Sequence, residues 1–424
     1  MRRSLVPSLT FVAVAVTLAV PAAPASRAQQ FPAGRLFVAS GGSDSVLIFD
    51  DKANLAGTVA DGGAPGQPRA LTFGPDGRLY VSSQDSGLVE VFNAAGEDVL
   101  TIPVPGLLSE PAAMAFGPDG LLHVLDAATA TLHAANVAGA PQGVVPLPPG
   151  DYAASGLAFG PDGHLFLSDA ATAQVFELDP GGSLIRAIGL GELAAPAGLA
   201  FGPGGLLHVA DGDAVVVFDD AGAVVDTLTG GALSGAGALA FGPDGHLYVA
   251  AAGGSGDVVE FNANGAQVKA FGSNHGLSAT GGLAFAPWRF KATVAGTLAR
   301  PGEPLQKVKE SNAVVSVQPG ARTLMMALTD DVSNAADLAS VFSAGFLVLR
   351  GFEGAESGAA NVRLFHGAQV EGPAQQDGVG SFVLRIKGTM KAGAFVPKGA
   401  LGVVHRAGAA GVYTATVKTT GLLK

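Results

Sequence analysis

The chain has 424 residues, of which 14% are charged and 62 are glycines, and its formal net charge is −11. Many glycines with few charges are typical of short strands joined by tight turns rather than of long solvated helices. Cysteine is absent, which excludes disulfides, thiolate metal sites and a cysteine nucleophile.

The first 28 residues are predicted to be a signal peptide. Arg2 and Arg3 precede an apolar run from Leu5 to Val20. Ser26-Arg27-Ala28 fits a small-x-small cleavage site, with Ala23-Pro24-Ala25 as the alternative. No later apolar run approaches the roughly 20 residues that cross a bilayer. We therefore expect an exported, periplasmic or extracellular protein with no transmembrane segment in the mature chain.

Charge divides the rest of the chain into two parts. Residues 29–287 contain 6 basic and 26 acidic residues, a net charge of −20, whereas residues 288–424 contain 15 and 9, a net charge of +6. This shift predicts a domain boundary between residues 287 and 288. The strong acidity of the first part argues against nucleic acid as its partner.

A Phe-Gly-Pro motif recurs along residues 29–287. Its spacings are 43, 43, 42 and 40 residues, and its phenylalanines are Phe73, Phe116, Phe159, Phe201 and Phe241. Phe31 begins a shortened first copy and Phe285 a last one. Periods of about 40 residues indicate repeated supersecondary units, and apolar residues that alternate within each unit indicate strands.

One unit shows the expected pattern of strands. We predict four of them, at Gly156–Phe159, His164–Ser168, Gln174–Leu178 and Ser183–Ile188. Pro161-Asp162-Gly163 has the composition of a tight turn between the first two, because proline presets φ and glycine accepts a positive φ. Four antiparallel strands per unit of this length make a blade of a β-propeller.

The two ends of the repeat array predict how the propeller closes. Arg35–Ala39, Val46–Phe49 and Asn54–Val59 supply only the second, third and fourth strands of a blade. Gly282–Phe285 supplies a lone first strand at the other end of the array. Together they complete one blade, so we predict an all-β, six-bladed propeller closed by its N- and C-terminal strands, without exposed sheet edges at the ends.

The units resemble NHL repeats, as Leu157-Ala-Phe-Gly-Pro-Asp-Gly-His-Leu-Phe-Leu-Ser-Asp illustrates, and they resemble the calcium-dependent six-bladed lactonases of the gluconolactonase (senescence marker protein) family. This resemblance implies a divalent cation in the central channel, with one ligand an Asn just before the first strand of a blade. The matching positions hold no Asn, Asp or Glu: they are Arg69, Ala112, Ser155, Ala197, Gly237 and Gly281. The family's catalytic residues therefore cannot be transferred to this chain.

Acidic residues are instead predicted on one rim, at the ends of second strands and in nearby loops. The candidates for a ligand or cation are Asp126, Asp169, Asp211, Asp213 and Asp257. Such a ring could attract calcium or a cationic ligand. Alternatively, each aspartate caps backbone N–H groups, and the recurrence of Asp126, Asp169 and Asp211 at one blade position favours this interpretation.

Arg69 and the histidines complete the candidate residues. Arg69 is the only charge expected on the inner strands, where it would meet an anionic group in the channel or pair with a rim carboxylate such as Asp61. His275 breaks the repeat in a rim loop and is the best candidate for a functional histidine. His123 and His208 replace Phe or Tyr of other blades and are expected to pack between blades. We expect His164 and His246, which follow the turn on the opposite face, to be solvent-exposed.

Residues 288–424 contain no copy of the repeat. Their sequence predicts seven or eight strands, which is typical of a smaller β-sandwich or barrel domain. One helix is predicted at Asp331–Phe342.

The leading functional hypothesis is an exported, non-catalytic binding or scaffold protein that uses the propeller rim to bind an unidentified protein or small-molecule partner. The alternatives are a divalent-cation-dependent lactonase or esterase with a loop-built site, and a structural surface protein of the cell envelope. We expect no cofactor, with calcium as the one alternative.

Overall fold

The computed structural model describes most of the chain from residue 34 onward. The described residues are 34–59, 66–74, 76–102, 110–117, 120–147, 153–160, 162–202, 205–253, 256–299, 304–317, 323–330, 346–353, 362–371, 378–391, 394–408 and 411–422. The predicted signal peptide and the predicted helix Asp331–Phe342 lie outside them.

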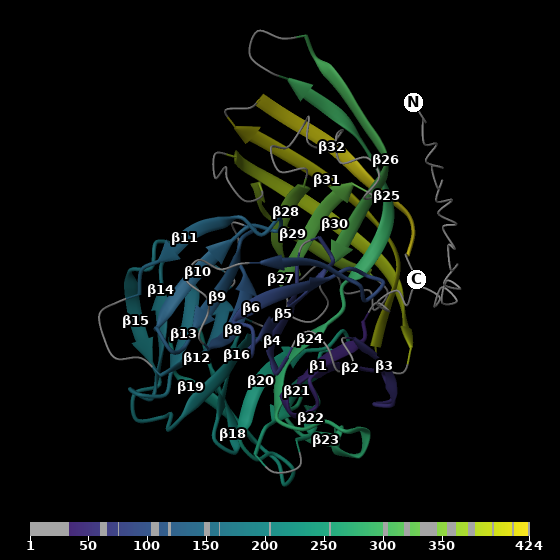
Figure 1. Cartoon of the computed structure of the whole chain (residues 1–424). Coiled ribbons are helices and arrows are strands. Elements are labelled where there is room, and N and C mark those ends of the chain that lie inside the picture. Colours follow the sequence, from purple (N-terminus) through teal and green to yellow (C-terminus); the bar gives the residue numbers. More distant parts are fainter. Residues whose placement is uncertain are drawn as a thin grey trace, which may run out of the picture.

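Six four-stranded antiparallel sheets form the blades of a propeller (Figure 1). Blade 1 consists of β24 (Thr280–Phe285), β1 (Leu36–Ser40), β2 (Ser45–Phe49) and β3 (Leu55–Val59). Blade 2 consists of β4 (Pro68–Phe73), β5 (Leu79–Ser83), β6 (Leu88–Phe92) and β7 (Asp98–Ile102). Blade 3 consists of β8 (Pro111–Phe116), β9 (Leu122–Asp126), β10 (Thr131–Ala135) and β11 (Pro141–Val145).

The remaining three blades repeat this order. Blade 4 consists of β12 (Ala154–Phe159), β13 (Leu165–Asp169), β14 (Gln174–Leu178) and β15 (Leu184–Ile188). Blade 5 consists of β16 (Pro196–Phe201), β17 (Leu207–Asp211), β18 (Ala214–Phe218) and β19 (Val224–Thr229). Blade 6 consists of β20 (Ala236–Phe241), β21 (Leu247–Ala251), β22 (Val258–Phe261) and β23 (Gln267–Phe271). Two short 3-10 helices, η1 (Gly41–Ser43) and η2 (Ser273–His275), lie in the connections.

The predicted closure of the ring is confirmed in blade 1. Its first strand, β24, comes from the end of the array and pairs antiparallel with β1 from the beginning, with Leu36 opposite Phe285 and Val38 opposite Leu283. Both ends of the propeller are therefore held by ladder hydrogen bonds instead of being left as free edges. This closure stabilises a chain that has no cysteine with which to form a disulfide.

The phenylalanine of the repeated motif joins each blade to its neighbour. In every blade an aromatic or histidine ring on the second strand meets the motif phenylalanine of the next blade edge-on, with ring centroids 4.8–5.1 Å apart. The pairs are Phe37–Phe73, Tyr80–Phe116, His123–Phe159, Phe166–Phe201, His208–Phe241 and Tyr248–Phe285. Edge-to-face pairs add about 0.5–1.5 kcal/mol each beyond the area they bury. The expected packing role of His123 and His208 is confirmed.

The innermost strands of neighbouring blades approach backbone to backbone. A Cβ atom placed on Gly156 would lie 2.1 Å from the carbonyl oxygen of Ala197 in blade 5. The corresponding distance is 2.3 Å from Gly198 to the oxygen of Gly237, and 2.4 Å from Gly281 to that of Arg69. Glycine is thus favoured at these three positions because a Cβ atom there would overlap the backbone of the next blade.

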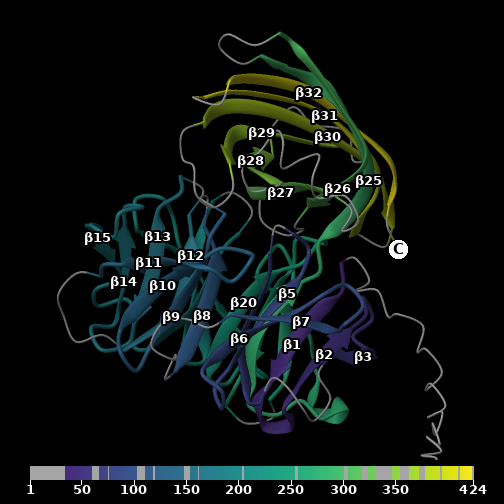
Figure 2. The same cartoon turned by 45° about the horizontal axis from the view of Figure 1, so that its top comes forward.

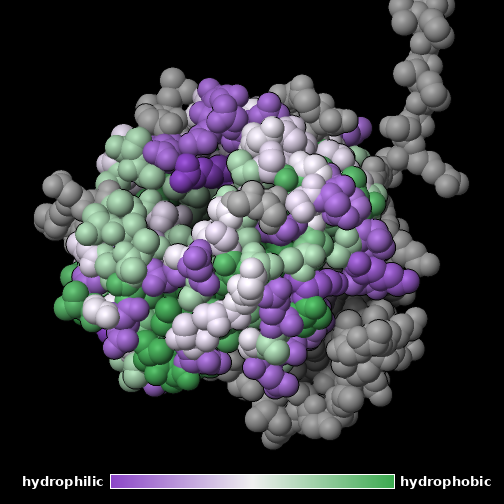
Figure 3. Space-filling view, turned by 90° about the horizontal axis from the view of Figure 1, so that it is seen from below, coloured by the Kyte–Doolittle hydropathy of each residue, from purple (hydrophilic) through white to green (hydrophobic). Residues whose placement is uncertain are grey.

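The propeller has two different faces, which we call the mouth face and the hairpin face. The first strands begin and the second strands end at the mouth face, where Ala154 pairs with Asp169. The hairpins of the Phe-Gly-Pro-Asp-Gly motif lie at the hairpin face, where Phe159 pairs with Leu165. Figure 3 shows one side of the molecule, with hydrophilic residues spread across it and hydrophobic residues gathered mainly at the lower left.

The remaining strands pair in chain order and close on themselves as a barrel, β32 lying beside β25. They are β25 (Trp288–Ala299), β26 (Gln306–Val317), β27 (Thr323–Asp330), β28 (Phe346–Glu353), β29 (Val362–Glu371), β30 (Gly378–Lys391), β31 (Ala394–Gly408) and β32 (Gly411–Leu422). Figure 2 shows them as a curved sheet distinct from the blades. Within the described part of the chain, no helix has the length and apolar character to span a membrane.

Candidate functional site

A cavity of about 800 Å³ occupies the centre of the propeller on the side of its mouth face. Each blade contributes to its wall the residue four positions before its repeat phenylalanine, which in blade 1 is Phe285. These six residues are Arg69, Ala112, Ser155, Ala197, Gly237 and Gly281. These six positions therefore surround the central cavity. Five of the six are small, because the inner strands converge there.

A ring of larger side chains marks the far end of this cavity. It lies two residues before each of the same phenylalanines and consists of Leu71, Met114, Leu157, Leu199, Leu239 and Leu283. All six are buried, with 5–8% of their surface exposed. The cavity thus has a polar mouth built by loops and an apolar ring at its far end.

Arg69 places one positive charge on the cavity wall. Its Nη1 donates to Oε1 of Glu110 at 2.8 Å, and each of the two side chains is 38% exposed. Asp61, the pairing partner considered from the sequence, lies outside the described residues. Since such a solvated pair contributes only about 0–1 kcal/mol, Arg69 can exchange Glu110 for an anionic group of a ligand at little cost.

Among the described residues that line the cavity, only Arg69 and Asp44 have ionisable side chains. Oδ1 of Asp44 accepts the backbone N–H of Gln67 at 2.8 Å, which ties blade 1 to the start of blade 2. A calcium ion needs six to eight oxygen ligands, usually including several carboxylates. The described wall offers one carboxylate, and its other oxygens belong to Ser, Thr, Gln and the backbone.

Asp126 and Asp169 are buried at the ends of their second strands, where they hold the backbone of their own blade. Asp126 accepts the N–H groups of Glu110 and Ala128 at 2.9 and 3.2 Å. Asp169 accepts the N–H of Ala153 at 2.7 Å and the hydroxyl of Thr172 at 2.5 Å. Each carboxylate therefore fixes the loop that enters the first strand.

The other three rim aspartates also accept backbone N–H groups, and Asp213 and Asp257 do so from the loop that leads to the next blade. Asp211 accepts the N–H of Ala195 at 2.6 Å, and Asp213 accepts that of Gly235 at 2.9 Å. Asp257 accepts the N–H of Ser273 at 2.8 Å. None of the five candidate aspartates contributes to the cavity wall. Backbone capping accounts for their positions, and no ligand needs to be invoked.

His275 does not reach the cavity either. It ends the short helix η2 and is half-buried, with its ring 5.9 Å from that of Phe49 in an edge-on contact. The structure brings Arg69 into the cavity, whereas the rim aspartates and His275 lie outside its wall.

His208 makes the propeller sensitive to acid. Burial lowers the pKa of His208 from 6.5 to about 4, although the backbone of Leu206 and the charge of Asp226 act in the opposite direction. In the unfolded chain His208 binds a proton below pH 6.5, whereas in the native propeller it binds one only below about pH 4. Stability from this group is therefore complete above pH 6.5 and is lost as the pH falls towards 4, by about 3 kcal/mol in total.

We expect His208→Phe to remove this loss, since Phe37 and Phe166 occupy the same blade position. Urea unfolding at about pH 7 and about pH 4.5 measures it. The variant should lose less stability between the two pH values than the wild type, whereas a His275→Gln control should match the wild type. Equal losses in the His208 variant and the wild type would show that His208 is not the group responsible.

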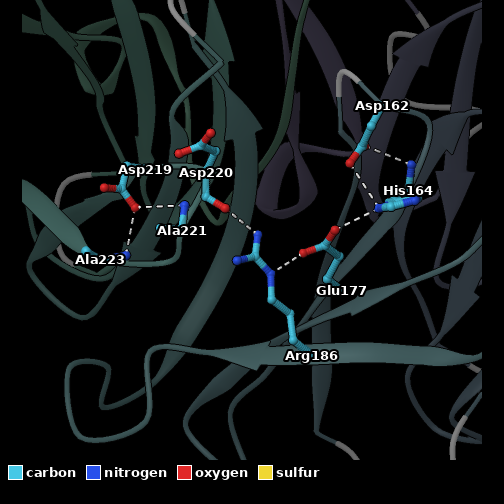
Figure 4. Close-up of polar contacts among 8 residues, drawn as sticks. All are labelled: Asp162, His164, Glu177, Arg186, Asp219, Asp220, Ala221 and Ala223. Carbon is cyan, nitrogen blue, oxygen red and sulfur yellow. Dashed lines mark hydrogen bonds and ion pairs between the residues drawn. The ribbon is translucent and has the colours of Figure 1, made fainter.

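The hairpin face carries a cluster that sequence reasoning missed (Figure 4). Nδ1 of His164 lies 2.7 Å from Oε1 of Glu177 and 2.9 Å from Oδ2 of Asp162. His164 is therefore half-buried and partnered, so the expectation of a solvent-exposed histidine is wrong. Burial alone would raise the pKa of the Glu177 carboxyl, but hydrogen bonds and charges from His164 and Arg186 hold it below the ordinary value.

Blade 6 repeats the cluster. Nδ1 of His246 lies 2.6 Å from Oε1 of Glu260, and Nζ of Lys269 lies 3.0 Å from the other carboxylate oxygen. His246, too, is half-buried rather than exposed. The signal in the sequence is a glutamate between two apolar residues of the third strand, 13 or 14 residues after the histidine of the Asp-Gly-His turn.

No protein-family model and no curated protein matches the sequence. Among solved structures, a protein of unknown function from Bacteroides caccae is similar with a TM-score of 0.51 and 18% identity, over 59% of this chain and 98% of that one. A chain of a nidogen/laminin complex gives a TM-score of 0.50 and 18% identity, over 59% and 98%. Virginiamycin B lyase from Staphylococcus aureus has a TM-score of 0.42 and 12% sequence identity, over 83% of this chain and 94% of that one. At 18% identity, the similarity to the first two structures shows the fold alone: a six-bladed β-propeller.

Proposed function

We propose that this chain is an exported, non-catalytic binding or scaffold protein whose propeller holds a ligand or partner at its mouth face. The observation that carries the proposal is the chemistry of the central cavity. Its volume of about 800 Å³ lies in the range of small-molecule sites, which are about 300–1,000 Å³. Its described wall offers small side chains, backbone and one cation, which suit binding.

The same wall lacks what the lactonase-type alternative needs. Hydrolysis requires a general base or a metal-bound water held close to the substrate. The described lining contains no histidine, and its carboxylate, Asp44, already accepts a backbone N–H. The resemblance to gluconolactonases thus supports the architecture of this proposal and not their chemistry.

The ligand class that fits best is a small organic molecule with an anionic group and an apolar part. Arg69 would bind the anionic group, because a guanidinium presents several donors and stays charged. The ring that includes Leu157 and Met114 would contact the apolar part. The acidic surroundings would weaken long-range attraction, so the affinity must come from contacts inside the cavity.

We expect calcium neither to stabilise the protein nor to support turnover. A cation at 100 times its dissociation constant would raise the free energy of unfolding by about 2.7 kcal/mol, which thermal melting detects. The assay compares melting, lactone hydrolysis and ester hydrolysis with calcium and with a chelator. Calcium-dependent turnover that disappears when Asp126, Asp169 and Asp211 are all replaced by Asn would contradict the proposal and establish a loop-built hydrolase.

A further inference from the structure

The clusters of blades 4 and 6 are the same four-residue unit. Blade 4 has Asp162, His164, Glu177 and Arg186, and blade 6 has Asp244, His246, Glu260 and Lys269. In the other four blades the place of the buried glutamate is taken by Ile48, Val91, Ala134 and Val217. The place of the histidine is taken there by Arg35, Arg78, Leu121 and Leu206. The histidine and the buried glutamate thus occur together or not at all.

Three donor atoms converge in blade 4. Oδ2 of Asp162, Nδ1 of His164 and Oε1 of Glu177 all lie within 4.8 Å of one another. One imidazole nitrogen and two carboxylate oxygens form a set that suits first-row divalent ions such as Zn²⁺. Zinc holds such ligands at about 2.0–2.2 Å, so its ligand atoms lie on the order of 3 Å from each other. The observed separations of 2.7 and 2.9 Å are close to that spacing.

The second atom of each carboxylate is already held, which orients the first. Oδ1 of Asp162 accepts the backbone N–H of His164 at 3.0 Å, and Oε2 of Glu177 accepts Nε–H of Arg186. Arg186 is itself fixed by Nη2, which donates to the carbonyl oxygen of Asp220 in blade 5 at 2.7 Å (Figure 4). Outer contacts of this kind set the direction of metal ligands and typically change affinity by about 10–100-fold.

The site is also accessible. The side chain of Glu177 is only 6% exposed, but those of His164 and Asp162 are 31% and 48% exposed. An ion can therefore enter from solvent, and water can complete its coordination. We propose that Asp162, His164 and Glu177 form a binding site for a divalent transition-metal ion, with Zn²⁺ as the best match. His164 binds through Nδ1 and carries its proton on Nε2.

Blade 6 provides an internal comparison. The hydroxyl of Tyr248 donates to Oδ2 of Asp244 at 2.9 Å, and this oxygen is 3.6 Å from Nδ1 of His246. Blade 4 has Phe166 in place of the tyrosine, so Oδ2 of Asp162 receives no such hydroxyl hydrogen bond and lies 2.9 Å from Nδ1 of His164. The blade 4 site should therefore bind zinc more tightly than the blade 6 site.

Calorimetric titration of the metal-free full chain with zinc tests this inference. We expect one tighter site and one weaker site in the wild type. His164→Gln should remove the tighter site, and Phe166→Tyr should weaken it about tenfold. Tyr248→Phe should tighten the weaker one. Tyrosine is native at this position in blades 2 and 6, so Phe166→Tyr preserves the packing.

Two controls make the result decisive. His275→Gln should leave both zinc sites unchanged, and calcium should bind neither, because three protein ligands that include a nitrogen do not satisfy it. No zinc uptake by the wild type would overturn the proposal and leave the clusters as ion-pair networks. So would zinc uptake that His164→Gln and Phe166→Tyr leave unchanged, or that His275→Gln removes. Thermal melting with zinc provides the readout should His164→Gln prove too unstable to titrate.

Discussion

Gly156→Ala is expected to destabilise the propeller by about 3 kcal/mol or to prevent it from folding. The added Cβ would lie 2.1 Å from the carbonyl oxygen of Ala197 and 2.7 Å from the hydroxyl oxygen of Ser168. The first of these atoms belongs to the backbone of the next inner strand, which cannot move without shifting blade 5. A closed ring of six blades has no free edge through which to release this strain.

Urea unfolding followed by circular dichroism measures the effect. Gly237→Ala is the matched control, because it also lies on an inner strand but its Cβ would make only an ordinary contact of 3.5 Å. The control should stay close to the wild type. If both variants lost similar stability, the cost would come from strand glycines in general and not from the close approach of the blades.

Glu90 is expected to make the propeller less stable as the pH rises from about 4.5 to 7. It is 6% exposed on the third strand of blade 2, and its Oε2 has no hydrogen-bond partner among the described residues. The equivalent residues of four other blades are apolar: Leu47, Phe176, Val216 and Val259. In blade 3 the position holds His133, whose Nδ1 is likewise without a partner in the described structure.

Burial, assisted by the charge of Asp98, raises the pKa of Glu90 from 4.5 to about 7. Between these values the native protein keeps a proton that the unfolded chain has lost, so the free energy of unfolding falls as the pH rises. The loss is about 1.4 kcal/mol per pH unit and about 3 kcal/mol in total. Glu90→Gln removes the titration, and Glu90→Val supplies the apolar residue of other blades.

Unfolding free energies at about pH 5 and about pH 8 test this expectation. Between these pH values the wild type should lose more stability than either variant. At about pH 8, Glu90→Val should be more stable than the wild type. Glu97→Gln is a suitable control, because Glu97 lies in an exposed turn of the same blade. An identical pH dependence in the wild type and Glu90→Gln would show that Glu90 does not titrate in this range.

The repeat made the propeller predictable in detail. The motif phenylalanines located the blades, and the incomplete units at the two ends located the closing strand, which the pairing of β1 with β24 confirms. The physical reason is that each turn and each alternating strand depends on only a few neighbouring residues. The same pattern of turn and strand residues then recurs in the successive blades. Residues 288–424 lack this redundancy, so their sequence limited them only to a sandwich or a barrel.

The site was less predictable because its contacts connect residues that are distant in the sequence. Arg69 lies on the cavity wall, and its partner Glu110 is 41 residues away in the sequence. The clusters of the hairpin face depend on register, since Glu177 meets His164 only because it pairs with Phe166 across the sheet. His164 follows a turn, so its local sequence predicts an exposed side chain. Its contact with the buried Glu177 can be recognised only when the register of the second and third strands is known.

Ligand binding at the mouth face is tested most directly by thermal melting against a panel of small organic anions. The proteins compared are the wild type, Arg69→Met and Arg78→Met, whose arginine is similarly exposed but follows a turn on the opposite face. We predict that at least one anion stabilises the wild type and Arg78→Met but not Arg69→Met. Stabilisation of all three proteins to the same extent, or conversion of the added compound to product, would contradict a non-catalytic binding cavity anchored by Arg69.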